Sequence, residues 1–105
     1  MSYYYRVLFL EQPREFIESL GVEDKAKVLA HITAIAEGDF NSIHTKPIKP
    51  PLRELIVKHY RVFFCIKKDA VYLLRAFVKK SAKTPRKEIV AAERAYRLVV
   101  RELYN

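Results

Sequence analysis

The side chains best suited to binding or catalysis lie in one basic stretch, residues 75–87. Six of its thirteen residues are lysine or arginine, and none is acidic. Cationic groups gathered in this way neutralise phosphates and release their counterions, which dominates the affinity of proteins for polyanions. The stretch therefore indicates a contact with nucleic acid or another polyanion. A basic surface without a partner is the plain alternative.

Charge is divided unevenly along the chain, whose formal net charge is +8. Residues 1–45 hold four basic and seven acidic side chains, whereas residues 46–105 hold sixteen basic and five acidic ones. We therefore expect the C-terminal part to carry the polyanion contact.

Several other kinds of chemistry are disfavoured by the composition. The single cysteine, Cys65, permits no internal disulfide and no cysteine-based metal site, and its apolar neighbours are typical of a buried, inert thiol. The scattered histidines His31, His44 and His59 lack the spacing of metal ligands, so we expect no metal and no other cofactor. No segment approaches the ~18 apolar residues of a membrane span, and no signal peptide is recognisable. A cytoplasmic protein is expected.

Hydrophobic periodicity predicts the elements that must position the basic stretch. Residues 3–10 are aromatic and β-branched, which predicts a strand, and apolar residues at helical spacing predict a short helix over 11–20. A second helix, with acidic residues in its first turn, is predicted between Gly21 and Gly38, so that the two helices form a hairpin. Prolines over residues 39–51 predict a loop.

The second half of the chain predicts a small sheet and a long helix. Strand-like runs at 52–58, 60–67 and 70–78 are separated by turns that permit only antiparallel hairpins. The run 60–67 is apolar on both faces, as in a central strand. Thr84-Pro85 predicts a helix start, because the hydroxyl caps backbone donors and proline suits the first helical position. The expected fold is therefore α+β, in the order β-α-α-β-β-β-α.

Three short motifs resemble a known family. They are Leu-Arg-Glu-Leu at 52–55, Tyr-Arg-Val-Phe-Phe at 60–64, and Phe-Val-Lys-Lys-Ser-Ala-Lys-Thr-Pro at 77–85, followed by Glu88-Ile89. The last block resembles the FVKKxxKTPxxEI signature of the phage-derived, HigB-like branch of the RelE/ParE superfamily, the toxins of bacterial type II toxin–antitoxin modules. The resemblance covers nearly the whole chain. It implies one RelE/HigB-like toxin domain over residues 1–105, with a helical hairpin and a C-terminal helix packed on a small twisted antiparallel sheet.

The resemblance also implies an activity. Toxins of this kind cleave mRNA on translating ribosomes, inhibit translation, and are silenced by a cognate antitoxin, which we expect to be a small helix-turn-helix protein. Metal-independent RNA cleavage proceeds by attack of a 2′-hydroxyl on the adjacent phosphate, so the enzyme must position the backbone, offset charge and assist proton transfer. Guanidinium groups bind phosphate oxygens in pairs, and lysine among other cations can transfer protons.

Five residues are candidates for this chemistry. Arg61, at the start of the central strand, is predicted to stabilise the phosphate, and Glu54 to orient a basic neighbour or accept a proton. A structural ion pair is the alternative for both. Lys79 and Lys80 close the next strand and point to opposite faces, so only one can share the face of Arg61, and the sequence leaves open which. Arg75 lies on the face of Lys79 and is a further candidate.

A second group of side chains is predicted to contact RNA. Three of them surround the start of the C-terminal helix, whose exposed N–H groups favour phosphate. Tyr104 either stacks on a base or packs on the protein. His59, in a turn beside Arg61, is either a proton-transfer group or a solvated side chain. The predicted RNA contacts are Arg53, Lys58, Lys83, Arg86, Lys87 and Tyr104.

One position departs from the family pattern. Ile56 stands two positions after Glu54, where the family usually has a basic residue. This motivates an RNA-binding module without catalysis as an alternative function. A ParE-like, non-enzymatic inhibitor of a protein such as gyrase is a second alternative, against which the Lys-Thr-Pro signature argues.

Overall fold

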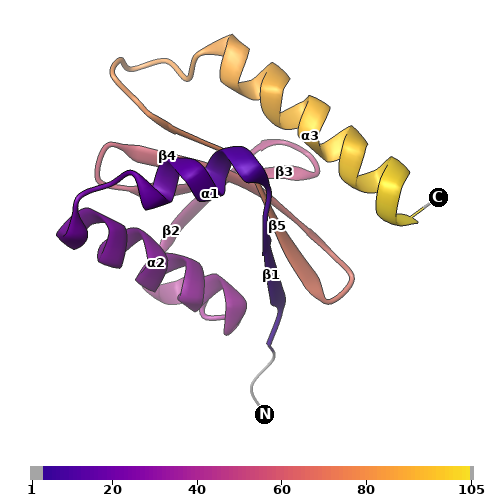
Figure 1. Cartoon of the computed structure of the whole chain (residues 1–105), viewed down its shortest axis with the longest axis horizontal. Coiled ribbons are helices and arrows are strands. Elements are labelled where there is room, and N and C mark those ends of the chain that lie inside the picture. The colour runs from indigo at the N-terminus through magenta and orange to yellow at the C-terminus, as the bar shows by residue number, and fades with distance from the viewer. Residues whose placement is uncertain (1–3, 105) are drawn as a thin grey trace.

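Three helices pack on a five-stranded sheet in the computed structural model, which describes residues 4–104 (Figure 1). The α+β class is confirmed, and the predicted helical hairpin is present. Tyr3, included in the first predicted strand, lies outside the described residues. The elements are β1 (Arg6–Phe9), α1 (Glu11–Glu18), α2 (Val22–Ala36), a 3-10 turn η1 (Phe40–Ser42), β2 (His44–Lys49), β3 (Leu52–Val57), β4 (Tyr60–Lys67), β5 (Ala70–Val78) and α3 (Arg86–Tyr104).

The strands lie in the order β1-β5-β4-β3-β2. Neighbours are antiparallel except for β1, which runs parallel to β5. The expectation of a purely antiparallel sheet is therefore wrong at this pair. The helical hairpin and three strands separate β1 from β5, and a connection of that length lets the chain re-enter the sheet in the same direction.

The predicted loop over residues 39–51 contains an edge strand, so that prediction is wrong for residues 44–49. β2 pairs with β3 alone, with Lys46 opposite Glu54. Proline lacks an N–H group, and an edge strand tolerates Pro47 because its outer side needs no hydrogen-bond donor. A register shift between Pro47 and Lys49 ends the regular pairing, and the chain turns back into β3.

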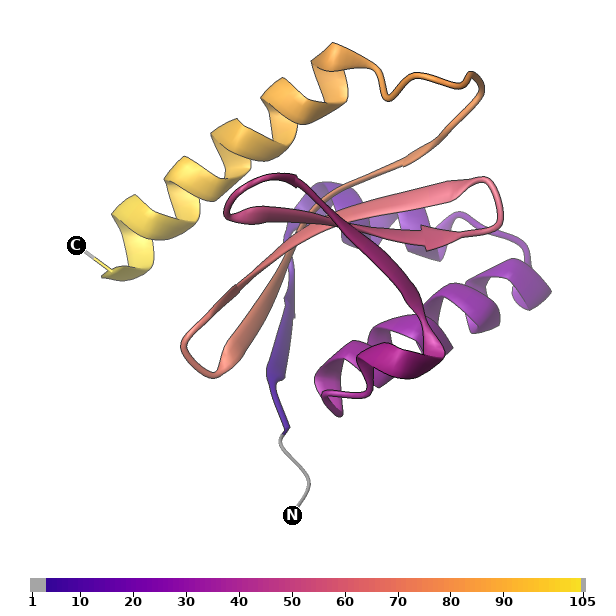
Figure 2. The ribbon, with the colours of Figure 1, turned by 180° about the vertical axis from the view of Figure 1, so that it is seen from behind.

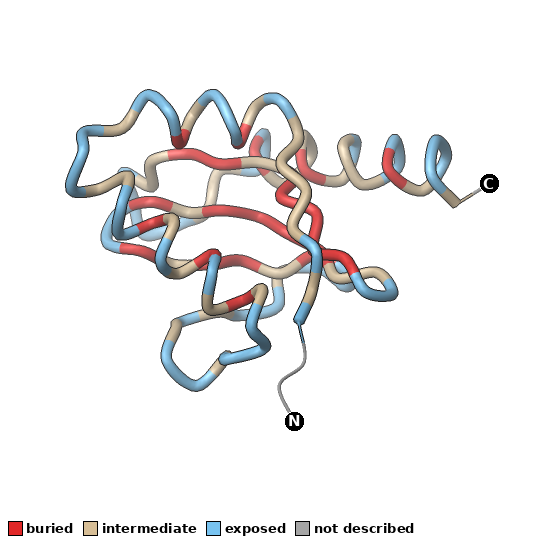
Figure 3. Tube along the Cα trace, turned by 60° about the horizontal axis from the view of Figure 1, so that its bottom comes forward, coloured by how far each residue is buried: buried red, intermediate tan, exposed pale blue. Residues whose placement is uncertain are grey.

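The sheet has a core on each face. The hairpin side chains Ile17, Val28 and Ile35 pack against one face, which includes Val62 and Phe64 of β4. Helix α3 covers the other face. Figure 2 shows the molecule from behind, and in this view the strands lie in front of α1. Buried residues follow the middle strands (Figure 3), which confirms the prediction of a central strand over 60–67.

A bulge in β5 places Leu73 and Arg75 on opposite faces of the sheet. Phe63 pairs with Arg75 and Phe64 with Leu73, so Leu74 is an extra residue. Leu73 consequently packs on the hairpin side, whereas Arg75 reaches Glu88 of α3.

Helix α3 begins one residue beyond Pro85. The Pro85 carbonyl accepts hydrogen bonds from the N–H groups of Glu88 at 3.0 Å and Ile89 at 3.5 Å. Pro85 thus occupies the capping position. The predicted cap by the Thr84 hydroxyl is wrong, since this group makes no hydrogen bond within residues 4–104. No helix in this range is long and apolar enough to cross a membrane.

Candidate functional site

A solvent-open hollow lies where β4 begins and β5 ends, and we call it the cationic hollow. The turn at Lys58 and His59 forms one wall, and the N–H group of Lys79 donates to the His59 carbonyl at 2.8 Å, which holds the two strand ends together. The predicted residues Arg61, Lys79 and Lys80 meet here. The hollow is lined by Lys58, His59, Arg61, Lys79, Lys80, Ser81 and Ala82.

Arg61 is held by the protein on one side of its guanidinium group. Its Nη1 donates to the carbonyls of Lys58 and Tyr60, each at 2.9 Å. Its Nε lies 3.9 Å from Oε2 of Glu54, and the side chain is only 14% exposed. The other terminal nitrogen, Nη2, has no hydrogen bond within the described chain. These contacts fix the orientation of the Arg61 guanidinium group at the hollow.

Glu54 is a fully buried carboxylate behind this arginine. Its side chain has 0% exposure, and neither oxygen has a hydrogen-bond partner among residues 4–104. Two cations approach it, Lys46 Nζ at 3.5 Å from Oε1 and Arg61 Nε at 3.9 Å from Oε2. Removing a charged side chain from water is costly unless opposite charges lie close to it. Glu54 therefore lies behind Arg61 as its counter-ion.

Two basic side chains on β2 were missed by the sequence reasoning. Lys46 lies opposite Glu54, and His44 lies opposite Ile56, which in turn pairs with Arg61. Lys46 and His44 share a face because they are two residues apart. They were missed because residues 39–51 were predicted to be a loop. The alternation of His44 and Lys46 was nevertheless a signal of a strand. His44 thus stands opposite Ile56 and Lys46 opposite Glu54, but neither side chain lines the cationic hollow.

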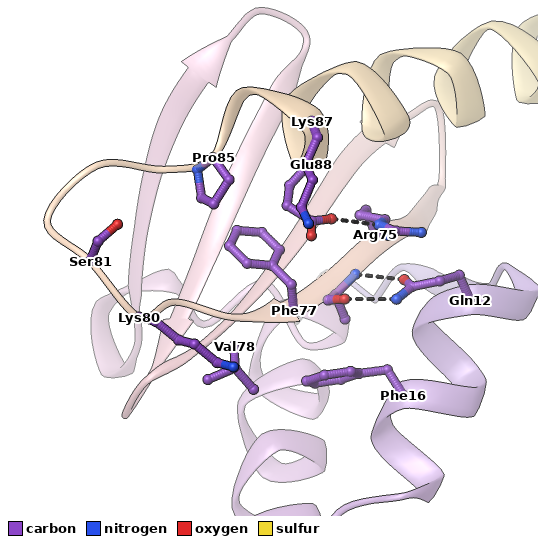
Figure 4. A pocket seen from close by; sticks show the side chains of 11 residues that line it. Gln12, Phe16, Arg75, Phe77, Val78, Lys80, Ser81, Pro85, Lys87 and Glu88 are labelled. Atoms are coloured by element: carbon purple, nitrogen blue, oxygen red, sulfur yellow. Dashed lines mark hydrogen bonds and ion pairs between the residues drawn. The ribbon is translucent and has the colours of Figure 1, made fainter.

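Arg75 lies outside the cationic hollow. Its Nε donates to Glu88 Oε1 at 2.7 Å, and the pair borders a neighbouring cavity, shown in Figure 4. Lys80 and Ser81 line both this cavity and the hollow. Of the five candidate catalytic residues, the structure thus groups Arg61, Lys79 and Lys80 at the hollow, with Glu54 behind them.

The turn at the hollow is tied to α2 through Asp24. Its carboxylate accepts hydrogen bonds from Lys58 Nζ at 2.8 Å and from the Tyr60 hydroxyl at 2.6 Å. These bonds lower the pKa of Asp24 and raise the pKa values of Lys58 and Tyr60. Tyr60 is only 8% exposed and packs in the core on the hairpin side of the sheet. His59 is exposed, with its ring centroid 4.3 Å from that of Tyr60.

The remaining predicted RNA contacts are spread over several surfaces. Lys83, Arg86 and Lys87 are exposed around the start of α3 and make no ion pair in the described part of the chain. Arg53, whose Nη2 donates to the Thr45 hydroxyl at 3.0 Å, belongs to the opposite face of β3 from Glu54.

Tyr104 lies at the other end of β5 from the cationic hollow. Its hydroxyl is 2.7 Å from that of Tyr72, and the ammonium groups of Lys67 and Lys68 lie 4.9 and 5.2 Å from the centroid of its ring. These contacts attach the end of α3 to the β4–β5 turn. Tyr104 thus packs on the protein, which is one of the two roles considered for it.

Cys65 is a buried core residue that does not line the cationic hollow. Burial raises the pKa of Cys65 to about 11, so its thiol stays protonated at neutral pH. Within residues 4–104, no three side chains of histidine, cysteine, aspartate or glutamate are grouped so as to hold a metal ion.

Comparison with known proteins gives both a family and a fold. No curated protein matches the sequence significantly. A chain of the toxin–antitoxin complex RelBE2 from Mycobacterium tuberculosis is 21% identical with a TM-score of 0.51, over 74% of this chain and 94% of that one. The isolated RelE toxin of E. coli is 13% identical with a TM-score of 0.59, over 90% of this chain and 98% of that one.

These likenesses establish a RelE-like fold and agree with the expected RelE/ParE superfamily, while the HigB-like branch stays a prediction. The model of the family described as "Phage derived protein Gp49-like (DUF891)" matches residues 15–97. On the strength of this match, which spans most of the sequence, the chain belongs to the phage-derived Gp49-like family.

Proposed function

We propose that the protein is the toxin of a type II toxin–antitoxin module and that it cleaves mRNA on translating ribosomes at the cationic hollow. The observation that carries this proposal is the convergence of Arg61, Lys79 and Lys80 on one open hollow, with Arg61 oriented by buried Glu54. The RelE-like fold supports it, since one similar structure is a RelE toxin and another a toxin–antitoxin complex.

The phosphate is the group that the hollow is suited to hold. Nη2 of Arg61 and the ammonium groups of Lys79 and Lys80 would donate to its non-bridging oxygens. Attack of the neighbouring 2′-hydroxyl forms a pentavalent phosphate with added negative charge, and cations fixed in advance stabilise that charge more than the substrate.

Two protons must move during this step. The 2′-hydroxyl loses one, and the departing 5′-oxygen gains one, which leaves a 2′,3′-cyclic phosphate and a 5′-hydroxyl. His59 lines the hollow and carries an imidazole, a group able to give and take protons near neutral pH. Lys79 or Lys80 is the other candidate, because both line the hollow and an ammonium group can donate a proton to the departing oxygen.

The exposed cations at the start of α3 would hold ribosomal RNA without taking part in the chemistry. Lys83, Arg86 and Lys87 are close to the hollow in sequence and are free to contact phosphates. An antitoxin with acidic segments would cover the same charges. Silencing by the antitoxin and binding of the ribosome are therefore expected to exclude each other.

Expression of the protein with and without its cognate antitoxin tests this function. Alone, it should arrest growth and create new mRNA 5′ ends inside translated regions, and the antitoxin should suppress both effects. Growth at the normal rate without new ends would remove the basis for the proposal.

A ribonucleic-acid-binding module without catalysis is the second candidate. Burial of the Arg61 side chain and its bonds to two turn carbonyls are compatible with a structural role. This candidate predicts that Arg61→Ala and Lys79→Ala keep full toxicity, whereas reversing the charges of Lys83, Arg86 and Lys87 abolishes it. The nuclease proposal predicts loss of cleavage in both alanine variants.

A further inference from the structure

A second cavity adjoins the cationic hollow between α1, β5 and the start of α3 (Figure 4). Its volume is about 410 Å³, within the range of small-molecule sites. Phe16 from α1 and Phe77 from β5 border the cavity from opposite faces of the sheet, and Val78 lies on the face of Phe16. The ring of Phe16 is half-buried, whereas Phe77 is only 6% exposed. A flat aromatic ligand suits this wall, because it can stack on the ring of Phe16.

The polar groups of the cavity are placed on one side. Arg75 Nε donates to Glu88 Oε1, and this carboxylate is only 10% exposed. The terminal nitrogens of Arg75 and the second oxygen of Glu88 have no hydrogen bond among residues 4–104. The pair thus offers a guanidinium fork and a carboxylate oxygen side by side.

The open edge of β5 adds a donor and an acceptor. The N–H and C=O groups of Ala76 face away from β4, and both are bonded by the Gln12 side-chain amide at 2.8 Å. Val78, two residues on, directs its backbone groups to the same edge. Val78 alone offers too few backbone groups to pair with another strand. Its N–H and C=O groups can, however, match the hydrogen-bonding edge of a single base.

We infer that this cavity holds one nucleobase of a single-stranded RNA, and that the Arg75–Glu88 pair favours guanine. Guanine presents two adjacent acceptors, O6 and N7, to an arginine fork, and its neighbouring N1–H suits a carboxylate. Uracil lacks the paired acceptors. The inference rests on the proposed function for its ligand class, RNA.

The shared wall explains how base and phosphate would be held together. Lys80 and Ser81 border both the cavity and the hollow, so a base in the cavity places its own backbone beside Arg61. The cavity would therefore select the nucleotide at the cleaved position.

Titration of the labelled full chain with mononucleotides tests the inference by amide chemical shifts in nuclear magnetic resonance. GMP should shift the amides of residues 76–78 and of Glu88 and should bind more tightly than UMP. Ribose 5-phosphate should shift only the amides around the hollow. Arg75→Lys keeps the charge but loses the fork, so the preference for GMP should fall about tenfold. Arg101→Lys, at an exposed site on the same helix as Glu88, should leave it unchanged.

Glu88→Gln provides a second test of ligand binding in the same cavity. It should weaken GMP binding, whereas Glu93→Gln, which removes a carboxylate paired with Lys49 at 2.9 Å, should not. Mononucleotides contain no bond for the nuclease to cut, so the two proposals fail separately. GMP binding without mRNA cleavage would refute only the nuclease. Cleavage without base-dependent shifts at the cavity would refute only the base site.

Discussion

Arg61 and Glu54 lie on neighbouring strands with Nε and Oε2 3.9 Å apart, and the carboxylate is completely buried. Glu54 has Lys46 on its other side at 3.5 Å. One acidic side chain therefore lies between two cations, of which Arg61 lines the cationic hollow. This relationship links the stability of the sheet to the orientation of the side chain that we assign to the phosphate.

Glu54→Ala should destabilise the protein by about 3 kcal/mol, because removing one member of a buried pair leaves Arg61 without its counter-charge. Glu54→Gln keeps the shape of the side chain and isolates the loss of charge. Urea unfolding measures both. The matched control is Glu102→Ala, at an exposed pair with Arg101, which should change stability by less than about 0.5 kcal/mol. Equal stability of Glu54→Ala and wild type would contradict a pairing role.

The Asp24 contact should make stability depend on pH in the acid range. The pKa of Asp24 is lowered by hydrogen bonds from Lys58 and Tyr60, so the bonds stabilise the fold above the ordinary value of about 3.9. This contribution is lost as pH falls through the folded pKa. Wild type should therefore exceed Asp24→Asn in unfolding free energy at neutral pH, and the difference should vanish in acid. Glu37→Gln, which removes an exposed carboxylate at the end of the same helix, is the control variant.

Cys65 should be inert in the folded protein. Burial raises its pKa to about 11, so little thiolate exists at neutral pH and reagents reach it only after unfolding. Reaction with a disulfide reagent should be far slower in the native state than in denaturant. Rapid labelling of native protein would show that the strand around Cys65 opens.

Tyr104→Phe should weaken the attachment of α3 without affecting cleavage. The variant loses a hydrogen bond to Tyr72, which is worth about 1 kcal/mol. The pKa of Tyr72, raised to about 12 by burial and by this bond, should fall but stay above its ordinary value. Thermal unfolding and an ultraviolet pH titration measure these effects. A large loss of RNA cleavage would instead assign Tyr104 to the RNA contact.

Much of the fold could be predicted from local periodicity. The apolar stripe of α2 and the two-sided apolar pattern of β4 determine their elements because both are buried by the sheet core. The edge strand β2 could not be recognised, since its outer side is solvated and Pro47 obscures the strand pattern.

The candidate site could likewise be predicted only in part. Arg61, Lys79 and Lys80 lie at the ends of adjacent strands, so a meeting of Arg61 with one of the two lysines could be anticipated. That both lysines line the hollow could not, because successive residues of a strand point to opposite faces. Arg75 shares the face of Phe77 and Lys79, as strand alternation predicts, but no glycine or proline announces the bulge at Leu74 that puts Leu73 on the opposite face. Lys46 and His44 required the register of β2, and the partner of Tyr104 depends on how α3 docks.

Cleavage of a defined mRNA during cell-free translation tests the central claim most directly, with wild type compared with Arg61→Ala. Wild type should create fragments with 5′-hydroxyl ends, and Arg61→Ala should cleave at least about 100-fold more slowly, as expected when a fixed donor to a developing oxyanion is lost. Arg101→Ala serves as the exposed control, and thermal unfolding verifies that each variant is folded. Intact mRNA with wild type, or equal cleavage by folded Arg61→Ala, would contradict the assignment of the cationic hollow as a nuclease site.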